Sequence, residues 1–355
     1  MKKVISKILI TVPTLEGGGM ERAAINYAIA FNKLGYKVKI FTVSNNIIWF
    51  DVPKEIEVIS GKKNTKDLWK VPLSLYRLRQ VSIKFHPNIV LSFSGRMSSF
   101  ICIALSGLAI PVIPFDRDNP TRSYGKFYDF LNSIVFPRCK AVVVQTEKAK
   151  QIFEKKFNLN SVIVVPNPIR KLNIDKVPKE KVIITLARLV DGKGIDKLIK
   201  IFSSINLQGW KLHILGDGYL MSDLENLVVK LNMEDKIKFL GFEKNVDTYL
   251  SRSSIFAFTS ESEGYPNALL EAMCSGLACI SFDCLAGPSD MITNGLNGFL
   301  VEMYNVIDYQ KKLELLMKDK TLRDKFSNKA LELNLSHDPD LIMKDFILQI
   351  EKLIV

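Results

Sequence analysis

The chain has 355 residues, of which 47% are hydrophobic and 24% are charged, and its formal net charge is +12. This length fits two domains of ordinary size, and the apolar content excludes a disordered or low-complexity chain. The five cysteines include no CxxC pair. A disulfide scaffold or a zinc site is therefore disfavoured, and reduced thiols in a cytosolic protein are expected.

The positive charge is concentrated in the first half of the chain. Residues 1–170 have 26 Lys and Arg against 11 Asp and Glu, a net charge of +15, whereas residues 171–355 have 23 against 26, a net charge of −3. This imbalance is typical of a domain with an anionic partner, although a solvated basic surface is the simpler alternative. No recognised nucleic-acid motif is present, so an anionic acceptor or membrane is favoured over nucleic acid.

The first half alternates short apolar runs with periodic segments, a pattern typical of βαβ units around a parallel sheet. A glycine turn at 16–19 separates a buried strand over 7–13 from a helix over 20–35. Lys7 interrupts the first apolar run and no small-residue cleavage site follows, which argues against a signal peptide. Further strands are expected over 38–44, 56–60, 88–94, 110–116, 141–146 and 161–167.

A basic and apolar segment occupies residues 61–86, and from Pro72 its apolar positions follow helical spacing. Basic side chains fall on the opposite face, as in a helix that lies on an anionic membrane. An amphipathic helix packed on the sheet explains the same pattern, and both interpretations stay open. No uncharged apolar run of about 18 residues occurs, so no membrane-spanning helix is expected.

A polar segment over 170–181 is predicted to link two domains. The alternation then restarts, with strands expected over 181–189, 210–218, 237–242, 254–260 and 277–283. Helices are expected over 194–205, 219–232, 245–253 and 267–276, and the chain ends in helical segments over 306–333 and 338–355. The sequence therefore predicts an α/β protein with two doubly wound domains.

Three motifs lie where a strand is expected to end and a helix to begin. EGGGMER (16–22) places three glycines at a helix N-terminus, which suits an anionic ligand, although a flexible turn is the simpler alternative. ARLVDGKGIDKLI (187–199) directs Arg188 and Lys193 toward one mouth of the sheet, where a cation pair suits a diphosphate. ILGDGYL (214–220) repeats this geometry. No GxGxxG pattern is present, so a dinucleotide-binding fold is disfavoured.

The most specific motif is SESEGYPNALLEAMCSG (260–276), in which seven residues separate Glu263 from Glu271. A Gly-Tyr-Pro turn precedes Asn267, which is expected to cap the following helix. Carboxylates accept hydrogen bonds from sugar and ribose hydroxyls, and the N–H groups of residues 265–269 suit an anion. One loop could therefore bind both the hydroxyls and the diphosphate of a nucleotide sugar.

Taken together, these motifs resemble those of the GT-B-fold retaining glycosyltransferases of family 4 (glycosyl transferases group 1), over nearly the whole chain. EGGGMER is similar to the first glycine loop of that family, TLARLVDGKGID to its Arg/Lys element and EGYPNALLE to its E-x7-E signature. The resemblance implies two Rossmann-like domains facing each other across a cleft. Residues 1–170 would bind the acceptor and residues 171–337 the nucleotide-sugar donor, and a C-terminal helix at about 338–355 would return to the first domain.

The resemblance also implies a role for each site residue. Arg188 and Lys193 would neutralise the donor diphosphate and stabilise the leaving nucleotide. Glu263 would bind the donor sugar and stabilise positive charge at its anomeric carbon, and Glu271 would hold the ribose hydroxyls. The other residues implied in donor binding are Gly18, Gly19, Gly216, Glu243, Gly264, Tyr265, Pro266, Asn267, Ala268 and Leu269.

One feature of the family pattern is missing. Many relatives place a histidine at the end of a late strand of the first domain, near the transferred sugar, and the three histidines of this chain lie elsewhere. The segment IPFDRDNPTR (113–122) has Asp116 and Arg117 there instead. Either would face the donor or the acceptor, unless the segment is only a structural turn. The group that takes the acceptor proton therefore stays open.

The resemblance implies a retaining hexosyltransferase that moves a hexose or N-acetylhexosamine from a UDP-sugar to a glycan or lipid-linked acceptor. The pathway would be bacterial surface polysaccharide biosynthesis (lipopolysaccharide O-antigen, capsule or exopolysaccharide). Neither metal nor cofactor is expected, because the Arg188/Lys193 pair and the helix starts already meet the charge of the leaving diphosphate. A GDP-mannose-type donor, a nucleotide-sugar epimerase and a non-catalytic nucleotide-sugar-binding subunit stay open. The expected location is cytoplasmic, with peripheral contact between the basic first domain and the anionic inner membrane.

Overall fold

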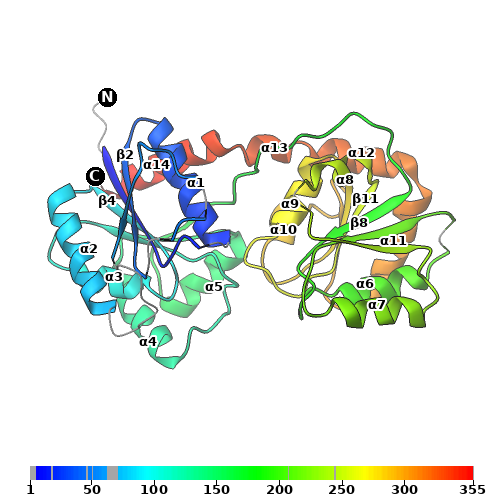
Figure 1. Ribbon diagram of the computed structural model, residues 1–355, viewed down its shortest axis with the longest axis horizontal. Coiled ribbons are helices and arrows are strands. Elements are labelled where there is room, and N and C mark those ends of the chain that lie inside the picture. The colour runs from blue at the N-terminus through cyan, green and yellow to red at the C-terminus, as the bar shows by residue number, and fades with distance from the viewer. Residues whose placement is uncertain are drawn as a thin grey trace. The chain divides into compact units, whose positions relative to one another are not determined.

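The computed structural model describes residues 5–16, 19–44, 47–49, 51–61, 71–206, 208–243 and 245–354. The chain divides into two compact units, one made of Met1–Asn167 with Pro339–Val355 and the other of Pro168–Asp338. Each unit is a parallel β-sheet covered by helices (Figure 1). The predicted α/β class with two doubly wound sheets is confirmed.

In the described part of the first unit, seven parallel strands form a sheet in the order β3-β2-β1-β4-β5-β6-β7. They are β1 (Lys7–Val12), β2 (Lys37–Thr42), β3 (Glu57–Ser60), β4 (Ile89–Phe93), β5 (Val112–Phe115), β6 (Val142–Val144) and β7 (Val162–Val164). In the central β1, Ile8 is in register with Val38 on one side and Ile89 on the other. These strands are rich in Val, Ile and Leu because helices cover both faces of the sheet.

Helices from both ends of the chain cover one face of this sheet. They are α1 (Gly19–Lys33) and α14 (Pro339–Ile354), which are blue and red in Figure 1. Phe346 of α14 packs edge-on against Tyr27 of α1, with ring centroids 5.9 Å apart, and it stacks on Phe31. The C-terminal helix is thus part of the first unit's core.

The opposite face of the sheet packs against α2 (Val71–Phe85) and α3 (Ser98–Ala104). Then come α4 (Lys126–Val135), the 3-10 helix η2 (Phe136–Arg138) and α5 (Glu147–Phe157). Residues 62–70, which include much of the basic segment at 61–86, lie outside the described residues. Leu78 and Phe85 are buried on the inner side of α2, whereas the Leu73 side chain is 63% exposed. Helix α2 therefore packs on the sheet and still has apolar side chains on its outer side.

The described part of the second unit has six parallel strands in the order β10-β9-β8-β11-β12-β13. The strands are β8 (Val182–Leu186), β9 (Lys211–Leu215), β10 (Ile237–Gly241), β11 (Ile255–Phe258), β12 (Ala278–Phe282) and β13 (Phe299–Val301). The helices are α6 (Ile195–Ser203), α7 (Met221–Lys230), α8 (Asp247–Arg252), α9 (Asn267–Cys274), α10 (Pro288–Met291), α11 (Val306–Lys318), α12 (Lys320–Ala330) and α13 (Leu333–Ser336).

The structure corrects two local predictions in this unit. The helical segment expected over 306–333 is interrupted at Asp319, whose side chain accepts a hydrogen bond from Leu322 N at 2.9 Å and starts α12. Asn267 is the first residue of α9 rather than its cap, and Pro266 precedes the helix without a side-chain cap. Across the described residues, no helix is both long and apolar enough to span a membrane.

Candidate functional site

Two loops of the second unit leave the sheet where the strand order changes direction. Strand β8 pairs with β9 on one side and β11 on the other, so the loops after β8 and β11 lie side by side at the carboxyl edge. Glu261 N donates to Gly192 O at 2.8 Å, and Thr259 Oγ1 donates to Lys193 O at 3.2 Å. Ligands of doubly wound sheets bind at such a switch point.

Two glycines allow the backbone of the loop after β8 to approach its neighbours closely, the loop after β11 at Gly194 and the loop after β9 at Gly216. Gly194 has φ +64°, and a Cβ there would lie 2.3 Å from Thr259 O. Gly216 has φ +138°, and a Cβ there would lie 1.8 Å from Ala187 O. A larger residue at either position would push the loops apart.

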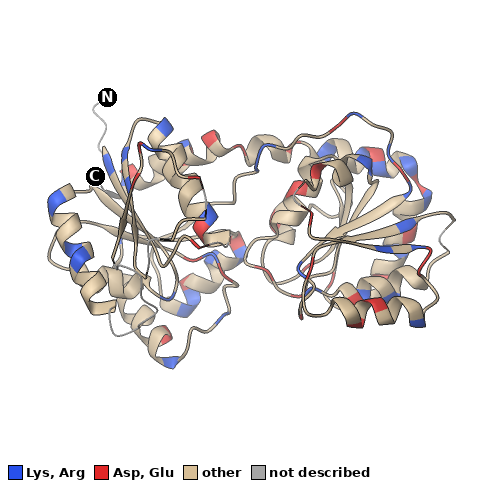
Figure 2. Ribbon diagram, viewed as in Figure 1, with Lys and Arg blue, Asp and Glu red and all other residues tan. Residues whose placement is uncertain are grey.

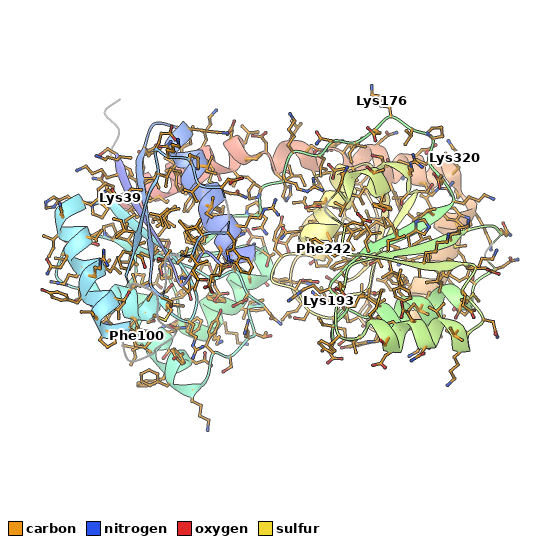
Figure 3. The ribbon with its side chains drawn as sticks, in the orientation of Figure 1. Lys39, Phe100, Lys176, Lys193, Phe242 and Lys320 are labelled. Atoms are coloured by element: carbon orange, nitrogen blue, oxygen red, sulfur yellow. The ribbon has the colours of Figure 1, made fainter. Side chains whose placement is uncertain are left out.

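The loop after β8 meets the loop after β11 through an ion pair. Lys193 Nζ lies 2.7 Å from Glu263 Oε1, and these side chains are only 17% and 16% exposed. Figure 3 labels Lys193 on this edge of the unit. The Arg188 guanidinium is exposed and forms no hydrogen bond or ion pair with any described residue. An anion at this edge would therefore meet one unpaired cation and one cation shared with a carboxylate.

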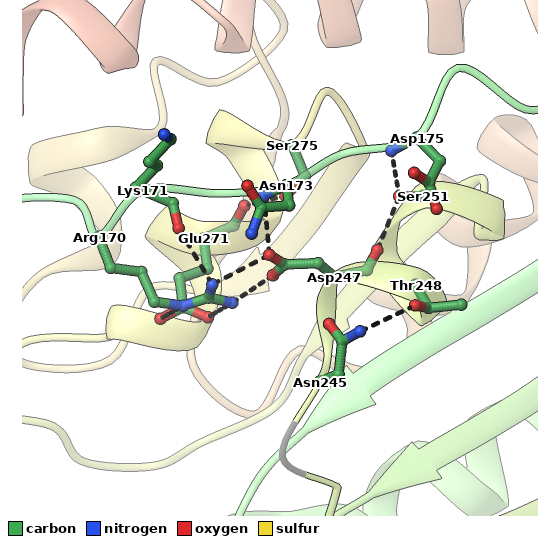
Figure 4. Close-up of polar contacts among 10 residues, drawn as sticks. All are labelled: Arg170, Lys171, Asn173, Asp175, Asn245, Asp247, Thr248, Ser251, Glu271 and Ser275. Carbon is green, nitrogen blue, oxygen red and sulfur yellow. Dashed lines mark hydrogen bonds and ion pairs between the residues drawn. The ribbon is translucent and has the colours of Figure 1, made fainter.

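Glu271 is held by Arg170, at the start of the chain's second unit (Figure 4). Arg170 Nη2 lies 3.1 Å from Glu271 Oε2, and Arg170 Nε lies 3.1 Å from Glu271 Oε1. Both Nη atoms also donate to Asp247, whose side chain is 6% exposed and accepts from Asn173 N at 2.8 Å. The hydrogen bond from Arg170 lowers the pKa of Asp247. This network fixes the orientation of the Glu271 side chain.

The turn between the two glutamates is anchored by a buried histidine. Tyr265 Oη lies 2.7 Å from His337 Nε2, and burial lowers the pKa of His337. His337 O in turn accepts from Ile169 N at 2.8 Å. The Asn267 N–H donates to Tyr265 O at 3.0 Å, so this amide is occupied within the turn.

The remaining donor residues implied by the resemblance lie around the same strand ends. Gly216 N donates to Gly241 O at 2.8 Å, and Glu243 accepts from Tyr249 Oη at 3.0 Å. Gly264 and Ala268 are partly exposed, whereas Pro266 and Leu269 are buried and can offer a ligand only backbone atoms.

In the first unit, Gly19 begins α1 after the β1 strand end, and a Cβ there would meet no atom within 4 Å. Gly18 lies outside the described residues. This part of the chain therefore leaves room beside the helix start, without contacts that identify a ligand.

Asp116 and Arg117 follow β5 and point to different surroundings. Asp116 is 6% exposed and accepts from Tyr124 Oη at 3.0 Å and from Asp118 N at 3.2 Å. Burial, with a smaller contribution from the Asp118 charge, raises the pKa of Asp116 to about 7. Arg117 donates to Asn167, and its guanidinium lies 6.0 Å from the ring centroid of the buried Tyr27. Asp116 can thus change protonation near neutral pH. The Arg117 side chain, by contrast, packs against the core of the first unit.

Sequence reasoning missed three residues that hold the segment over 260–276 in place. Arg170 contacts Glu271 across 101 residues of sequence, His337 contacts Tyr265 across 72, and Asp247 contacts Arg170 across 77. No local pattern signals such distant contacts. No group of three or more His, Cys, Asp and Glu within the described ranges could hold a metal ion.

Comparisons with known proteins match both units. The model described as "Glycosyltransferase Family 4" matches residues 17–171, and "Glycosyl transferases group 1" matches residues 169–333. An uncharacterized glycosyltransferase of Haemophilus influenzae is 30% identical over 88% of this chain and 90% of its own. A GalNAc-α-(1→4)-GalNAc-α-(1→3)-diNAcBac-PP-undecaprenol α-1,4-N-acetyl-D-galactosaminyltransferase of Campylobacter jejuni is 27% identical over 91% and 92%.

Solved structures share the fold at lower identity. A mutant of S. aureus TarM, crystallised with fondaparinux, α-GlcNAc-glycerol and UDP, superposes with a TM-score of 0.80 at 15% identity. The match covers 99% of this chain and 100% of the TarM chain.

Proposed function

The chain belongs to the group 1 glycosyltransferases and has the GT-B fold, and we propose that it is a retaining hexosyltransferase that uses a UDP-sugar. The donor sugar is a hexose or N-acetylhexosamine, and the acceptor is a glycan or lipid-linked glycan of bacterial surface polysaccharide biosynthesis. The arrangement of Arg188, Lys193 and Glu263 in two adjacent loops, with Glu271 in the helix α9 that follows the second loop, carries this proposal. The lipid-linked acceptor named for the Campylobacter relative and the UDP bound to TarM support it.

Arg188 and Lys193 act on the leaving nucleotide. As the bond between sugar and phosphate breaks, negative charge grows on the diphosphate, and fixed cations lower the energy of that state. Lys193 is placed by its ion pair with Glu263. The same pair keeps the Glu263 carboxylate beside the diphosphate site, where it stabilises positive charge on the anomeric carbon.

Glu271 binds the ribose of the donor. An ionised carboxylate has about four lone-pair positions, and Arg170 uses one on each oxygen. The remaining positions accept the two ribose hydroxyls. Because Arg170 fixes the carboxylate beforehand, little conformational entropy is lost when the donor binds.

Asp116 is our candidate for the group that handles the acceptor proton. A group that accepts and returns a proton works best with a pKa near the working pH, and burial raises the pKa of Asp116 to about 7. The hydrogen bond from Tyr124 Oη orients its carboxyl group.

The transfer proceeds without a metal ion, because Arg188, Lys193 and the start of α9 meet the charge of the diphosphate. Excess EDTA should leave the rate unchanged, and full loss of activity that Mg²⁺ restores would refute this part. We also propose that the basic first unit brings the enzyme to the cytoplasmic face of the anionic inner membrane, where lipid-linked acceptors would lie.

A thermal-shift screen against UDP, GDP and their sugars tests the donor. A ligand that binds the native state raises the unfolding midpoint, so UDP-sugars should stabilise the second unit more than GDP-sugars. Lys193→Ala and Glu271→Ala should each abolish donor-dependent transfer, whereas Lys200→Ala, in an exposed ion pair with Asp196, should not. Near-normal rates in both site variants would overturn the assignment. Epimer formation without acceptor, or binding without turnover, would favour the alternatives.

A further inference from the structure

Three neighbouring helices of the first unit present large apolar side chains to solvent. Helix α3 contacts α2 on one side and α4 on the other (Figure 1). We call their outer surface the α2–α4 face. Its apolar members are each between 38% and 64% exposed, namely Leu73, Tyr76, Ile83, Ile103, Phe127, Phe130 and Ile134. Exposed large apolar side chains that gather on three adjacent helices indicate an interaction surface, because single exposed apolar residues are otherwise scattered.

The exposed Phe127 ring and the neighbouring Tyr128 ring of α4 pack against α3. Phe100 of α3 lies 6.3 Å from Phe127 and 6.0 Å from Tyr128, measured between ring centroids. The Arg96 guanidinium lies 4.5 Å from the Tyr128 ring centroid. Figure 3 labels Phe100 at this place in the unit. The α2–α4 face is therefore preorganised for a partner.

The charge of this face is positive. Residues 71–115 contain no Asp or Glu, and Figure 2 shows α2 with basic residues and no acidic ones. Exposed cations accompany the apolar side chains, namely Arg77, Lys84, Arg96, Lys126, Arg138 and Lys140. Asp129 of α4 is acidic, but its carboxylate accepts hydrogen bonds from Ser123 Oγ and Tyr124 N. Apolar groups interleaved with cations match the chemistry of an anionic bilayer surface.

A cavity of about 590 Å³ opens beside this face, between the ends of α3 and η2 and the start of β5. Ile103, Val112 and Val135 contribute to its apolar wall, and Arg138 and Lys140 are its charged lining residues. Its volume lies within the usual range for sites that hold small organic ligands. Asp116 lies just past the other end of β5, so the cavity is separate from the candidate catalytic groups.

We propose that the α2–α4 face docks on a bilayer of anionic phospholipid and that one lipid occupies this cavity. Its acyl chain lies against Ile103, Val112 and Val135, and its phosphate is bound by Arg138 and Lys140. A second copy of the chain is a poorer occupant, because two such faces would bring like charges together. The inference rests on the peripheral contact in the proposed function, and is independent of the transfer reaction.

Sedimentation with vesicles tests the docking. The full chain should bind vesicles containing phosphatidylglycerol more tightly than vesicles of phosphatidylcholine alone, and added salt should weaken binding. Phe127→Ser and Phe130→Ser should each weaken binding about tenfold, since each removes a large apolar side chain from the contact. Leu348→Ser, on the 57% exposed side chain of α14, is the matched control and should bind normally. Because all three side chains are exposed, the fold should persist, and an unchanged unfolding midpoint verifies this.

The Cys139 thiol reports on the cavity. It lines the cavity, and its Sγ lies 3.6 Å from Cys102 Sγ; the hydrogen bond from Cys102 lowers the pKa of Cys139. A maleimide should therefore react with Cys139, and phosphatidylglycerol vesicles should slow that reaction at least fivefold while phosphatidylcholine vesicles do not. An unchanged rate in vesicle-bound protein would overturn the assignment of the lipid to the cavity.

Other outcomes separate this inference from the proposed function. Equal binding to both vesicle types, or normal binding by both Phe→Ser variants, would overturn the docking. A dimer in the absence of lipid that these variants dissociate would assign the face to a second copy instead. A chain that ignores vesicles but is stabilised by UDP would refute the docking and leave the transfer proposal intact. A chain that binds phosphatidylglycerol vesicles but is not stabilised by UDP would support the docking and refute the transfer proposal.

Discussion

Replacing Arg170 by methionine removes a cation from between two carboxylates of the donor site. Asp247 is 6% exposed and would keep its hydrogen bond from Asn173 N, while Glu271 would lose both contacts with the guanidinium. Methionine keeps much of the length of the side chain and none of its charge. The change therefore tests the ion pairs with little loss of packing.

The magnitude follows from burial. Removing one partner of a buried ion pair costs about 3–5 kcal/mol. The Arg170 side chain is 32% exposed, so water can reach the site and reduces the expected cost to about 2 kcal/mol. The pKa of Asp247 is lowered in the folded state, so its ion pair with Arg170 stabilises the fold at pH values above the ordinary carboxyl pKa. This contribution is lost as the pH falls through the pKa that Asp247 has in the folded state. The cost should be largest near pH 7 and shrink at acidic pH.

Urea unfolding of the second unit measures this cost, with Arg252→Met as the control. Arg252 is 62% exposed and lies 3.9 Å from Glu180, so its loss should cost less than about 0.5 kcal/mol. Arg170→Met should also weaken UDP binding about tenfold, because Glu271 is no longer oriented. Arg170→Lys should recover part of the stability but little of the affinity, since an ammonium cannot contact both carboxylates as the planar guanidinium does. A loss below about 0.5 kcal/mol at pH 7, or one independent of pH, would refute the reasoning.

Three further substitutions test other parts of the structure. Gly216→Ala should lower the free energy of unfolding in urea by more than about 4 kcal/mol, because the new methyl group would lie 1.8 Å from the backbone oxygen of Ala187. Gly209→Ala is the control: its methyl group would meet nothing within 4 Å, so only its positive φ should count, at about 1 kcal/mol. The raised pKa of Asp116 means that the folded state holds this proton more tightly, so stability should fall as pH rises from about 4 to about 7, by up to about 4 kcal/mol. Asp116→Asn should flatten that slope, and an unchanged slope would contradict the assigned proton. Tyr265→Phe leaves the His337 imidazole without its 2.7 Å partner and should cost about 1–2 kcal/mol by the same method, with no change if this bond contributes nothing.

The sheets could be predicted because their strands are apolar runs separated by periodic segments. Strands such as ILIT in β1 and ACISF in β12 are fully buried and leave no polar alternation. Strand β13 escaped prediction because its apolar run is limited to Phe299–Val301, whereas β6 and β7 lie in apolar runs of four residues, 141–144 and 162–165. Helix α4 (Lys126–Val135) also escaped prediction, although its apolar residues follow helical spacing.

The site could be predicted in part. The positions of Arg188, Lys193 and Glu263 at strand ends follow from the βα pattern, because carboxyl ends of parallel strands share one edge. The pairing of Lys193 with Glu263 did not follow, since it depends on side-chain orientation across 70 residues. The contact between Arg170 and Glu271 did not follow from the sequence either. Arg170 ends a short apolar segment, and only the fold brings it to Glu271.

The most direct test of the function is the product of the reaction itself. The full chain is incubated with an α-linked UDP-hexose or UDP-N-acetylhexosamine, a lipid-linked glycan acceptor and excess EDTA, and the anomeric configuration of the product is determined by NMR. A retaining, metal-independent transferase predicts an α-linked product that Glu271→Ala abolishes. A β-linked product, or release of free sugar with no transfer to any acceptor, would contradict it.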